Sequence, residues 1–124
     1  MRKADYSENT KAFYSPYVVS GNKMYISGQL PIKDSKPEAV QGGIAVQTRQ
    51  ALENMEEHLK KESLTRDSVI MCRIYACNIN DWDAINSAYA EFFGDHKPAR
   101  VVIPVSPLLF GCKLEIEAVA EISK

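Results

Sequence analysis

The segment KLEIEAVAEI, at residues 113–122, constrains the fold more than any other part of the chain. Its apolar and charged side chains alternate, which is the pattern of a β-strand that buries one face. One face carries Leu114, Ile116, Ala118, Ala120 and Ile122, and the other carries Glu115, Glu117, Val119 and Glu121. The chain therefore needs a sheet, and apolar groups must cover one side of it.

Further β-rich runs precede this segment. They occupy residues 17–20, 23–27, 68–77 and 100–105. The pair Gly21-Asn22 is a two-residue turn signal between the first two runs, which predicts a β-hairpin near the N-terminus.

Two other segments have the period of a helix that is buried on one side. Apolar residues recur at every third or fourth position between residues 44 and 61. A second helix is predicted to start near Asn80 or Asp81, either of which can cap it, and to end at Gly94. The order ββαβαββ indicates an α+β fold, in which two helices cover one face of a mixed sheet.

The second face of this sheet is also apolar. The run VVIPV, at residues 101–105, places apolar side chains on both sides of its strand. Such a face is too apolar for a monomer, and contact with copies of the same chain in closed symmetry is a simple way to bury it. We therefore expect a homo-oligomer.

Length and charge exclude several classes of protein. The 124 residues fit one domain, residues 1–124, and 15 basic against 16 acidic residues give a net charge of -1. This balance argues against nucleic acid as a partner, because nucleic-acid binders carry a basic face. The chain has no apolar run of membrane-helix length and no signal-peptide core at its N-terminus, so we expect a cytoplasmic protein without a membrane partner.

Standard catalytic signatures are missing. The sequence contains no GxSxG, P-loop, GxGxxG or HExxH motif. The three cysteines lack CxxC spacing, so we expect buried thiols without a zinc site or a disulfide; they are Cys72, Cys77 and Cys112.

Arg100 stands at the mouth of a hydrophobic strand, directly after the residues KPA. It can be a solvent-exposed residue at a strand end, or its guanidinium can bind a small anion. If the strands at residues 100–105 and 113–122 were neighbours, Arg100 could meet Glu115 or Glu117 on the sheet face away from the helices. A buried structural salt bridge would explain such a pair equally well, so the residues alone leave both readings open.

Four segments occur in a specific order along the chain: SPYVVSGNKMYISGQLP, QTRQALENM, INSAYAEFFGDHKPAR and KLEIEAVAEI. Together they resemble the RidA family of reactive intermediate deaminases, also called endoribonuclease L-PSP or liver perchloric-acid-soluble protein. The resemblance extends from about Tyr14 to Ile122. It implies a chorismate-mutase-like α+β subunit and a homotrimer with sites between subunits, and it implies that neither a cofactor nor a metal is needed.

The resemblance also implies roles for individual residues. Arg100, in PAR, resembles the arginine that holds the substrate carboxylate. Glu115, in EIEA, resembles the residue that positions the attacking water. The substrate-binding positions implied in the same way are Tyr17, Ser27, Gly28, Asn86 and Val102.

Two positions depart from the family pattern. Many members have a cysteine where this chain has Val102, and the loop proline of the family is replaced by Leu109. The backbone of Val102 can still serve the site, whereas any role of the thiol is lost. Leu109 is expected to change the shape of the loop and, with it, the preference among substrates.

The activity implied by the resemblance is hydrolysis of 2-enamino and 2-imino acids to 2-keto acids and ammonia. Examples of these substrates are 2-aminoacrylate, its tautomer 2-iminopropanoate, and 2-iminobutanoate. The ligand is then a small 2-imino or 2-keto carboxylate, and the functional partners are pyridoxal-phosphate-dependent dehydratases that release such compounds. The alternatives are an endoribonuclease that inhibits translation, a trimer that binds small carboxylates without catalysis, and a structural trimer with an inert cleft.

Overall fold

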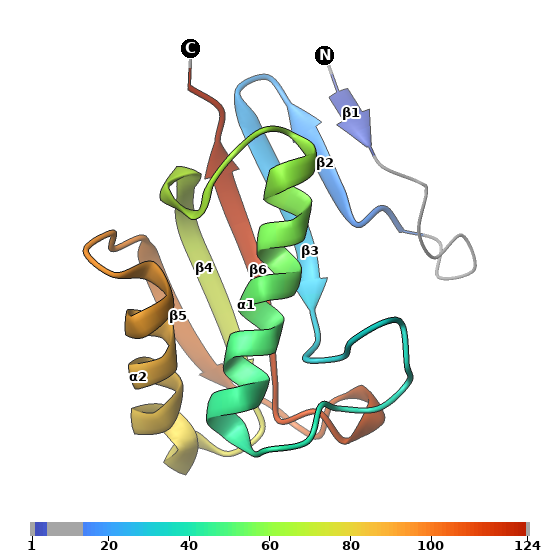
Figure 1. Ribbon diagram of the computed structural model, residues 1–124, viewed down its shortest axis with the longest axis vertical. Coiled ribbons are helices and arrows are strands. Elements are labelled where there is room, and N and C mark those ends of the chain that lie inside the picture. The colour runs from blue at the N-terminus through green and yellow to red at the C-terminus, as the bar shows by residue number, and fades with distance from the viewer. Residues whose placement is uncertain (1, 5–13, 124) are drawn as a thin grey trace.

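The computed structural model describes residues 2–4 and 14–123, which form a mixed sheet with two helices on one face (Figure 1). The strands are β1 (Arg2–Ala4), β2 (Tyr17–Ser20), β3 (Lys23–Gln29), β4 (Val69–Ala76), β5 (Ala99–Pro104) and β6 (Leu114–Glu121). The helices are α1 (Ile44–Lys61) and α2 (Trp82–Phe93), and short 3-10 turns occur at Arg66–Ser68, Ile79–Asp81 and Leu109–Gly111. The predicted α+β architecture is confirmed.

Strand β6 lies inside the sheet, whose order is β1-β2-β3-β6-β4-β5. It is antiparallel to both of its neighbours, β3 and β4. Strands β4 and β5 are parallel, and α2 supplies the crossover connection that parallel neighbours require. As a result, β5 is an edge strand, and β4 separates it from β6.

The alternation in β6 decides which face of the sheet is buried. Its apolar side chains are buried against the helices, and the buried face of α1 packs on the same core, as its amphipathic pattern predicts. The fully buried core side chains include Leu52, Met55, Leu59, Leu114, Ile116 and Ala120. Burial of each large apolar side chain contributes about 1.5–3 kcal/mol to folding.

Some local features differ from the sequence predictions. The sequence pattern does not predict β1, because RKA has no apolar alternation; this strand pairs with β2. Asp81, one of the two predicted candidates, occupies the N-cap position of α2, but its side chain forms no capping hydrogen bond. Instead Asn78 caps the preceding 3-10 turn, where its Oδ1 accepts a hydrogen bond from the Asn80 N–H at 2.9 Å. Helix α2 ends at Gly94, as predicted, and this glycine has a left-handed φ of +64°.

Both described helices lie on the same side of the sheet, so neither covers the opposite side (Figure 1). On that opposite side, Tyr25 and Val101 are 49% and 40% exposed. The pairing register places further apolar residues on the same face, namely Val18, Met71, Ile103 and Val119. The expected homo-oligomer would bury this face and stays a prediction.

The three cysteines are free thiols in this structure. Cys72 and Cys112 are buried, as the sequence predicts, whereas Cys77 is only half-buried. Within residues 2–4 and 14–123, no three His, Cys, Asp or Glu side chains are placed to share a metal ion. No helix in this part of the chain combines the length and apolar character that spanning a membrane requires.

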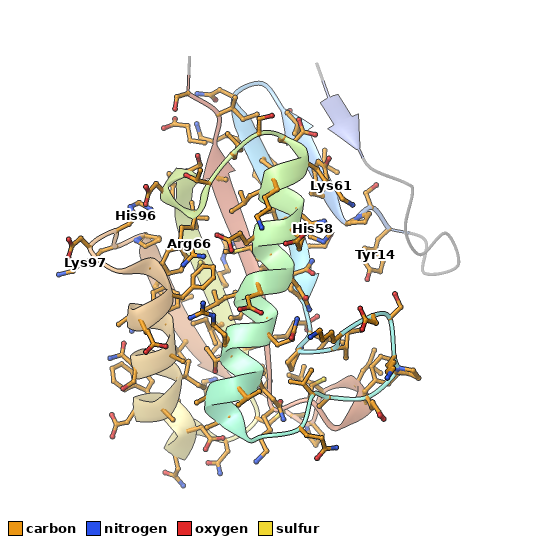
Figure 2. All side chains as sticks on the ribbon, viewed as in Figure 1. Tyr14, His58, Lys61, Arg66, His96 and Lys97 are labelled. Atoms are coloured by element: carbon orange, nitrogen blue, oxygen red, sulfur yellow. The ribbon has the colours of Figure 1, made fainter. Side chains whose placement is uncertain are left out.

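Arg66 joins the two helices from the turn before β4 (Figure 2). Its Nε and Nη2 donate to the two carboxylate oxygens of Glu56 in α1, at 2.7 and 2.9 Å. Its Nη1 donates to the backbone carbonyl of Phe92 in α2, and its Cζ lies 3.8 Å from the centroid of the Phe92 ring. The side chains of Arg66 and Glu56 are only 32% and 15% exposed, so this pair is less screened than an ordinary surface ion pair.

We predict that Arg66→Ala lowers the free energy of unfolding by about 3 kcal/mol. The substitution leaves the Glu56 carboxylate and the Phe92 carbonyl partly buried without their donor. Urea denaturation measures the change. Lys60→Ala is the control, because Lys60 and Glu57 form an ion pair whose side chains are 62% and 67% exposed, and its loss should cost less than about 1 kcal/mol. Equal losses in the two variants would contradict the role of Arg66.

Candidate functional site

Arg100 is the second residue of β5, and its side chain is held against α2. It pairs with the fully buried Cys72 of β4, so its side chain leaves the sheet on the helix side. Its Nη1 donates a hydrogen bond to Asn86 Oδ1 at 2.8 Å. Its Cζ lies 4.8 Å from the ring centroid of Tyr89 and 5.6 Å from that of Trp82. The guanidinium is therefore fixed by one hydrogen bond and two aromatic rings.

A hollow of about 360 Å³ adjoins Arg100. It is bounded by α2, the loop after it and the start of β5; its walls include Asn86, Tyr89, Phe93, His96, Pro98 and Arg100. Rings and aliphatic groups form part of the wall, and less polar surroundings strengthen the attraction between a guanidinium and an anion. Arg100, Asn86 and this hollow are called the arginine half-site below.

Glu115 is the second residue of β6, and its carboxylate lies against Gly28 of β3. A Cβ atom on Gly28 would lie only 2.6 Å from Glu115 Oε2, so the absence of a side chain at Gly28 makes room for the carboxylate. The pairing of β3 with β6 shifts in register between Ile26 and Gln29, which is the irregularity that contains Gly28. The sequence SGQ therefore lies at a strand end and also allows the Glu115 carboxylate to approach the backbone of Gly28.

The Glu115 carboxylate lies in a partly dry environment. Burial, and after it the negative charge of Glu117, raise the pKa of Glu115 above its ordinary value. A hollow of about 660 Å³ adjoins it, with walls that include Gly28, Leu30, Asn54, Leu109, Phe110 and Glu115. A carboxylate with a raised pKa beside such a space can accept a proton from water. Glu115, Gly28 and this hollow are called the glutamate half-site below.

The side chains of Arg100 and Glu115 leave the sheet on opposite faces. Strand β4 stands between β5 and β6, with Arg100 paired to Cys72 and Glu115 paired to Tyr75. Positions 72 and 75 have opposite parity, so their side chains point to opposite faces. The hypothesis that Arg100 meets Glu115 or Glu117 away from the helices is therefore wrong within one chain.

Tyr17 and Ser27 have structural partners in their own chain. Tyr17 is 3% exposed, and its hydroxyl donates to Glu62 Oε2 at 2.7 Å. The Ser27 hydroxyl donates to the carbonyl of Ser15 at 2.6 Å, and the Ser27 N–H donates to the carbonyl of Pro16 at 2.9 Å. Neither side chain belongs to the walls of the two hollows. Both residues tie the hairpin to its surroundings.

Of the two departures from the family pattern, only Leu109 lies in the wall of a half-site. Val102 follows Arg100 by two residues on the same face of β5 and packs at the edge of the core. Leu109 is 67% exposed, and the next residue, Phe110, has a left-handed φ of +59°. Both Leu109 and Phe110 form part of the wall of the glutamate half-site, so the position that lost the proline shapes that hollow.

Sequence reasoning missed two aromatic residues that contact Arg100. Trp82 and Tyr89 precede and follow Asn86 by four and three positions, so all three lie on one side of α2. This spacing is visible in the sequence, but the sequence pattern places Tyr89 only on the apolar face of the helix. The missing information was the position of β5, which brings Arg100 to this side of α2.

The family model described as endoribonuclease L-PSP matches residues 7–122. The chain belongs to this family. The resemblance to the RidA family is thereby confirmed, and solved members such as a protein of the conserved Rid family from Yersinia pestis share its fold, with a TM-score of 0.88 and 30% identity over 98% of this chain and 100% of that one.

Two relatives extend the comparison. A RutC family protein of Pyrococcus horikoshii is 39% identical over 123 residues, which are 97% of this chain and 98% of the relative. The human 2-iminobutanoate/2-iminopropanoate deaminase is 37% identical over 107 residues, which are 86% of this chain and 78% of the human protein. The family therefore includes proteins named as imine deaminases beside members whose names carry no activity.

We predict that Gly28→Ala lowers the free energy of unfolding by about 1–3 kcal/mol, because its new Cβ displaces the Glu115 carboxylate. The same substitution in a Glu115→Ala background should cost much less, because the clashing side-chain atoms are absent. Urea denaturation of both single variants and the double variant gives the coupling between the two positions. Strictly additive effects would contradict the contact.

We also predict that Glu115→Gln stabilises the protein more at pH 7 than at pH 4. Because the pKa of Glu115 is raised in the folded state, folding is favoured when the Glu115 carboxyl is protonated. This contribution to the free energy of unfolding is present below the ordinary pKa and is lost as the pH rises through the pKa of the folded state. The glutamine variant avoids that loss. Thermal unfolding at about pH 4 and about pH 7 measures the difference. Glu38→Gln in an exposed loop is the control, and a gain for Glu115→Gln that is independent of pH would contradict the prediction.

Proposed function

We propose that the chain hydrolyses reactive 2-imino acids, such as 2-iminopropanoate and 2-iminobutanoate, to 2-keto acids and ammonia. In this proposal Arg100 holds the substrate carboxylate and Glu115 positions water. The observation that carries it is the Arg100 guanidinium, fixed by Asn86 beside a hollow large enough for a small acid. The human relative named 2-iminobutanoate/2-iminopropanoate deaminase supports the choice of substrate.

Arg100 suits the carboxylate of such a substrate. A guanidinium has five N–H donors, and the Asn86 bond uses one of them. The remaining donors can form two parallel hydrogen bonds with a carboxylate, which fix both its charge and its orientation. The C=N carbon next to that carboxylate is then held in one place for attack.

Glu115 suits the hydration step. Glu115 accepts one proton from water as the water oxygen adds to the imine carbon, and it returns that proton to the nitrogen to give the carbinolamine. Glu115 then moves the hydroxyl proton of the carbinolamine to the amino nitrogen. The C–N bond breaks as the C=O bond forms, so ammonia leaves and a 2-keto acid remains. The pKa of Glu115 is raised toward neutral pH, which makes its carboxylate a stronger base. Proton transfer by such a group contributes a factor of about 10²–10⁴ to the rate.

The site needs two chains in this proposal. Arg100 and Glu115 arise on opposite faces of their own sheet, so one substrate can meet both only if the half-sites come from different copies. The uncovered apolar face, which includes Tyr25 and Val101, supplies a surface for such assembly. We propose a closed homotrimer, the state that the family resemblance implies, with a site at each junction.

The other predicted site residues receive supporting roles in this proposal. Asn86 orients Arg100, and Gly28 makes room for Glu115. Tyr17 and Ser27 hold the hairpin that carries Gly28. Val102 lies on the edge strand, where backbone groups on the outer side have no strand partner among the described residues and are available to a ligand.

The source of the substrate follows from its short lifetime. Imino acids of this kind arise when a pyridoxal-phosphate-dependent dehydratase removes water from a hydroxy amino acid. We propose that such enzymes are the functional partners of this chain, which would remove the product that they release. Cytoplasmic location stays an expectation of the sequence.

Two alternatives have specific support. The family description names an endoribonuclease, although the net charge of -1 offers little attraction for RNA. The E. coli relative TdcF, whose structure contains bound serine, favours binding of a small amino acid; it has a TM-score of 0.82 and 31% identity, over 89% of this chain and 88% of that one. RNA cleavage lost in Arg100→Ala would favour the first, and carboxylate binding without turnover would favour the second.

We predict that Arg100→Ala and Glu115→Ala each lower kcat/KM for freshly generated 2-iminobutanoate at least about 100-fold. A pyridoxal-phosphate-dependent dehydratase generates the imine, and ammonia release reports its hydrolysis. Arg49→Ala on the surface of α1 is the matched control and should retain full activity. Equal acceleration by wild type, Arg100→Ala and Glu115→Ala would exclude the proposed site.

Mixing the two inactive variants tests whether the site spans two chains. If Arg100 and Glu115 come from different copies, random co-assembly leaves about a quarter of the sites with both native residues, and that share of the activity returns. If both residues act from one chain, every site lacks one of them and no activity returns. Sedimentation of the mixture confirms that mixed particles have formed.

A further inference from the structure

Tyr89 lies behind the Arg100 guanidinium in the arginine half-site. Its ring centroid is 4.8 Å from Arg100 Cζ, closer than the 5.6 Å of the Trp82 ring. Trp82 is 40% exposed, whereas Tyr89 is only 7% exposed. The inner ring is therefore the better shielded of the two surfaces that contact the cation, and a cation–π contact is stronger where water is excluded.

The Tyr89 ring is itself held in place. It packs on the Phe93 ring with 4.7 Å between centroids, one helical turn along α2. On the sheet side it approaches Cys72, a fully buried thiol whose burial raises its pKa to about 11 and keeps it uncharged. Burial first, and the Cys72 thiol after it, also raise the pKa of Tyr89, so its hydroxyl stays neutral. The ring cannot turn away from Arg100 without disturbing this packing.

The Tyr89 hydroxyl does not explain the presence of the residue. It is buried beside the Cys72 thiol, which is at most a weak hydrogen-bond partner, and no stronger partner among the described residues bonds to it. Such a contact gains little for a buried hydroxyl, so the useful part of Tyr89 is its ring face. Phenylalanine would present the same face, whereas leucine would fill much of the space without a π-system.

We propose that Tyr89 is a positioning residue, whose ring holds the Arg100 guanidinium in the orientation that a substrate carboxylate meets. This inference rests on the proposed function, because it assigns Arg100 as the group that binds the carboxylate. Asn86 fixes one nitrogen from the side, and the Tyr89 ring fixes the plane from behind. Together they restrict the Arg100 side chain before any ligand binds. Less rotamer entropy is then lost on binding.

The test compares Tyr89→Phe, Tyr89→Leu and Phe92→Leu. Phe92→Leu is the matched control, because Phe92 is a buried ring of the same helix that contacts Arg66 and lies outside the walls of the hollow. Isothermal titration with 2-oxobutanoate, a stable 2-keto carboxylate, measures the affinity of the half-site. NMR relaxation of the Arg100 Nε–H group measures the order of the guanidinium without any ligand.

The expected result is about tenfold weaker binding in Tyr89→Leu, with a more mobile Arg100, and wild-type behaviour in Tyr89→Phe. Imine hydrolysis in Tyr89→Leu should show a raised KM with a smaller change in kcat. Phe92→Leu should melt at a lower temperature but keep the affinity and the Arg100 order of the wild type. A merely structural role would make the two leucine variants alike.

The two readouts separate this inference from the proposed function. If Arg100 is as ordered in Tyr89→Leu as in wild type, the positioning role is overturned, whatever the protein hydrolyses. If wild type binds no 2-oxobutanoate and hydrolyses no imine, the proposed function fails. A loss of Arg100 order confined to Tyr89→Leu would still support the positioning role in that case.

Discussion

The whole structure depends on the pairing of β6 with both β3 and β4. This strand carries apolar side chains on one face and mainly glutamates on the other, and its interior place in the sheet imposes that division on its neighbours. The helices must pack on the apolar face, because the carboxylates cannot be buried there without large desolvation costs. Glu115 is consequently directed away from the helices, at the point where β3 passes closest and only Gly28 leaves room for it.

Strand order then decides how a site can be built. Helix α2 carries the chain across to β5 at the edge, and the parallel register there sets Arg100 beside Cys72, on the helix face. Three side chains of α2 contact it, from Trp82, Asn86 and Tyr89. One chain thus prepares a cation on one face and a carboxylate on the other. Each has its own support, but strand β4 separates them and they leave the sheet on opposite faces.

The sequence predicts much of this fold, because period and turn chemistry are local properties. The alternation at 113–122 and the helical period at 44–61 locate β6 and α1 correctly. Strand order is not local, and it is the reason that the supposed meeting of Arg100 with Glu115 inside one chain is wrong. Strand β1 could not be predicted either. A three-residue edge strand needs only backbone hydrogen bonds to its neighbour, so its side chains need not follow any pattern. The cap at Asn78 was missed because a 3-10 turn precedes α2.

The candidate site was predictable to a similar extent. Family motifs pointed to Arg100, Glu115 and Asn86 as candidates whose roles stay predictions, whereas composition and spacing alone left Arg100 with two readings. Tyr17 and Ser27 lie near the proposed machinery but have partners within the chain, at Glu62 and Ser15, that motifs cannot reveal. The aromatic support of Arg100 requires the tertiary position of β5, and no local pattern encodes it.

The edge position of β5 has one more consequence. An open strand rich in valine and isoleucine is a template on which foreign chains can add by backbone pairing, the first step toward aggregation. Here Pro98 precedes the strand and Pro104 is its last residue, and neither has an N–H with which to continue a ladder. The two prolines keep this edge short, which limits the number of backbone N–H groups with which a foreign strand could pair.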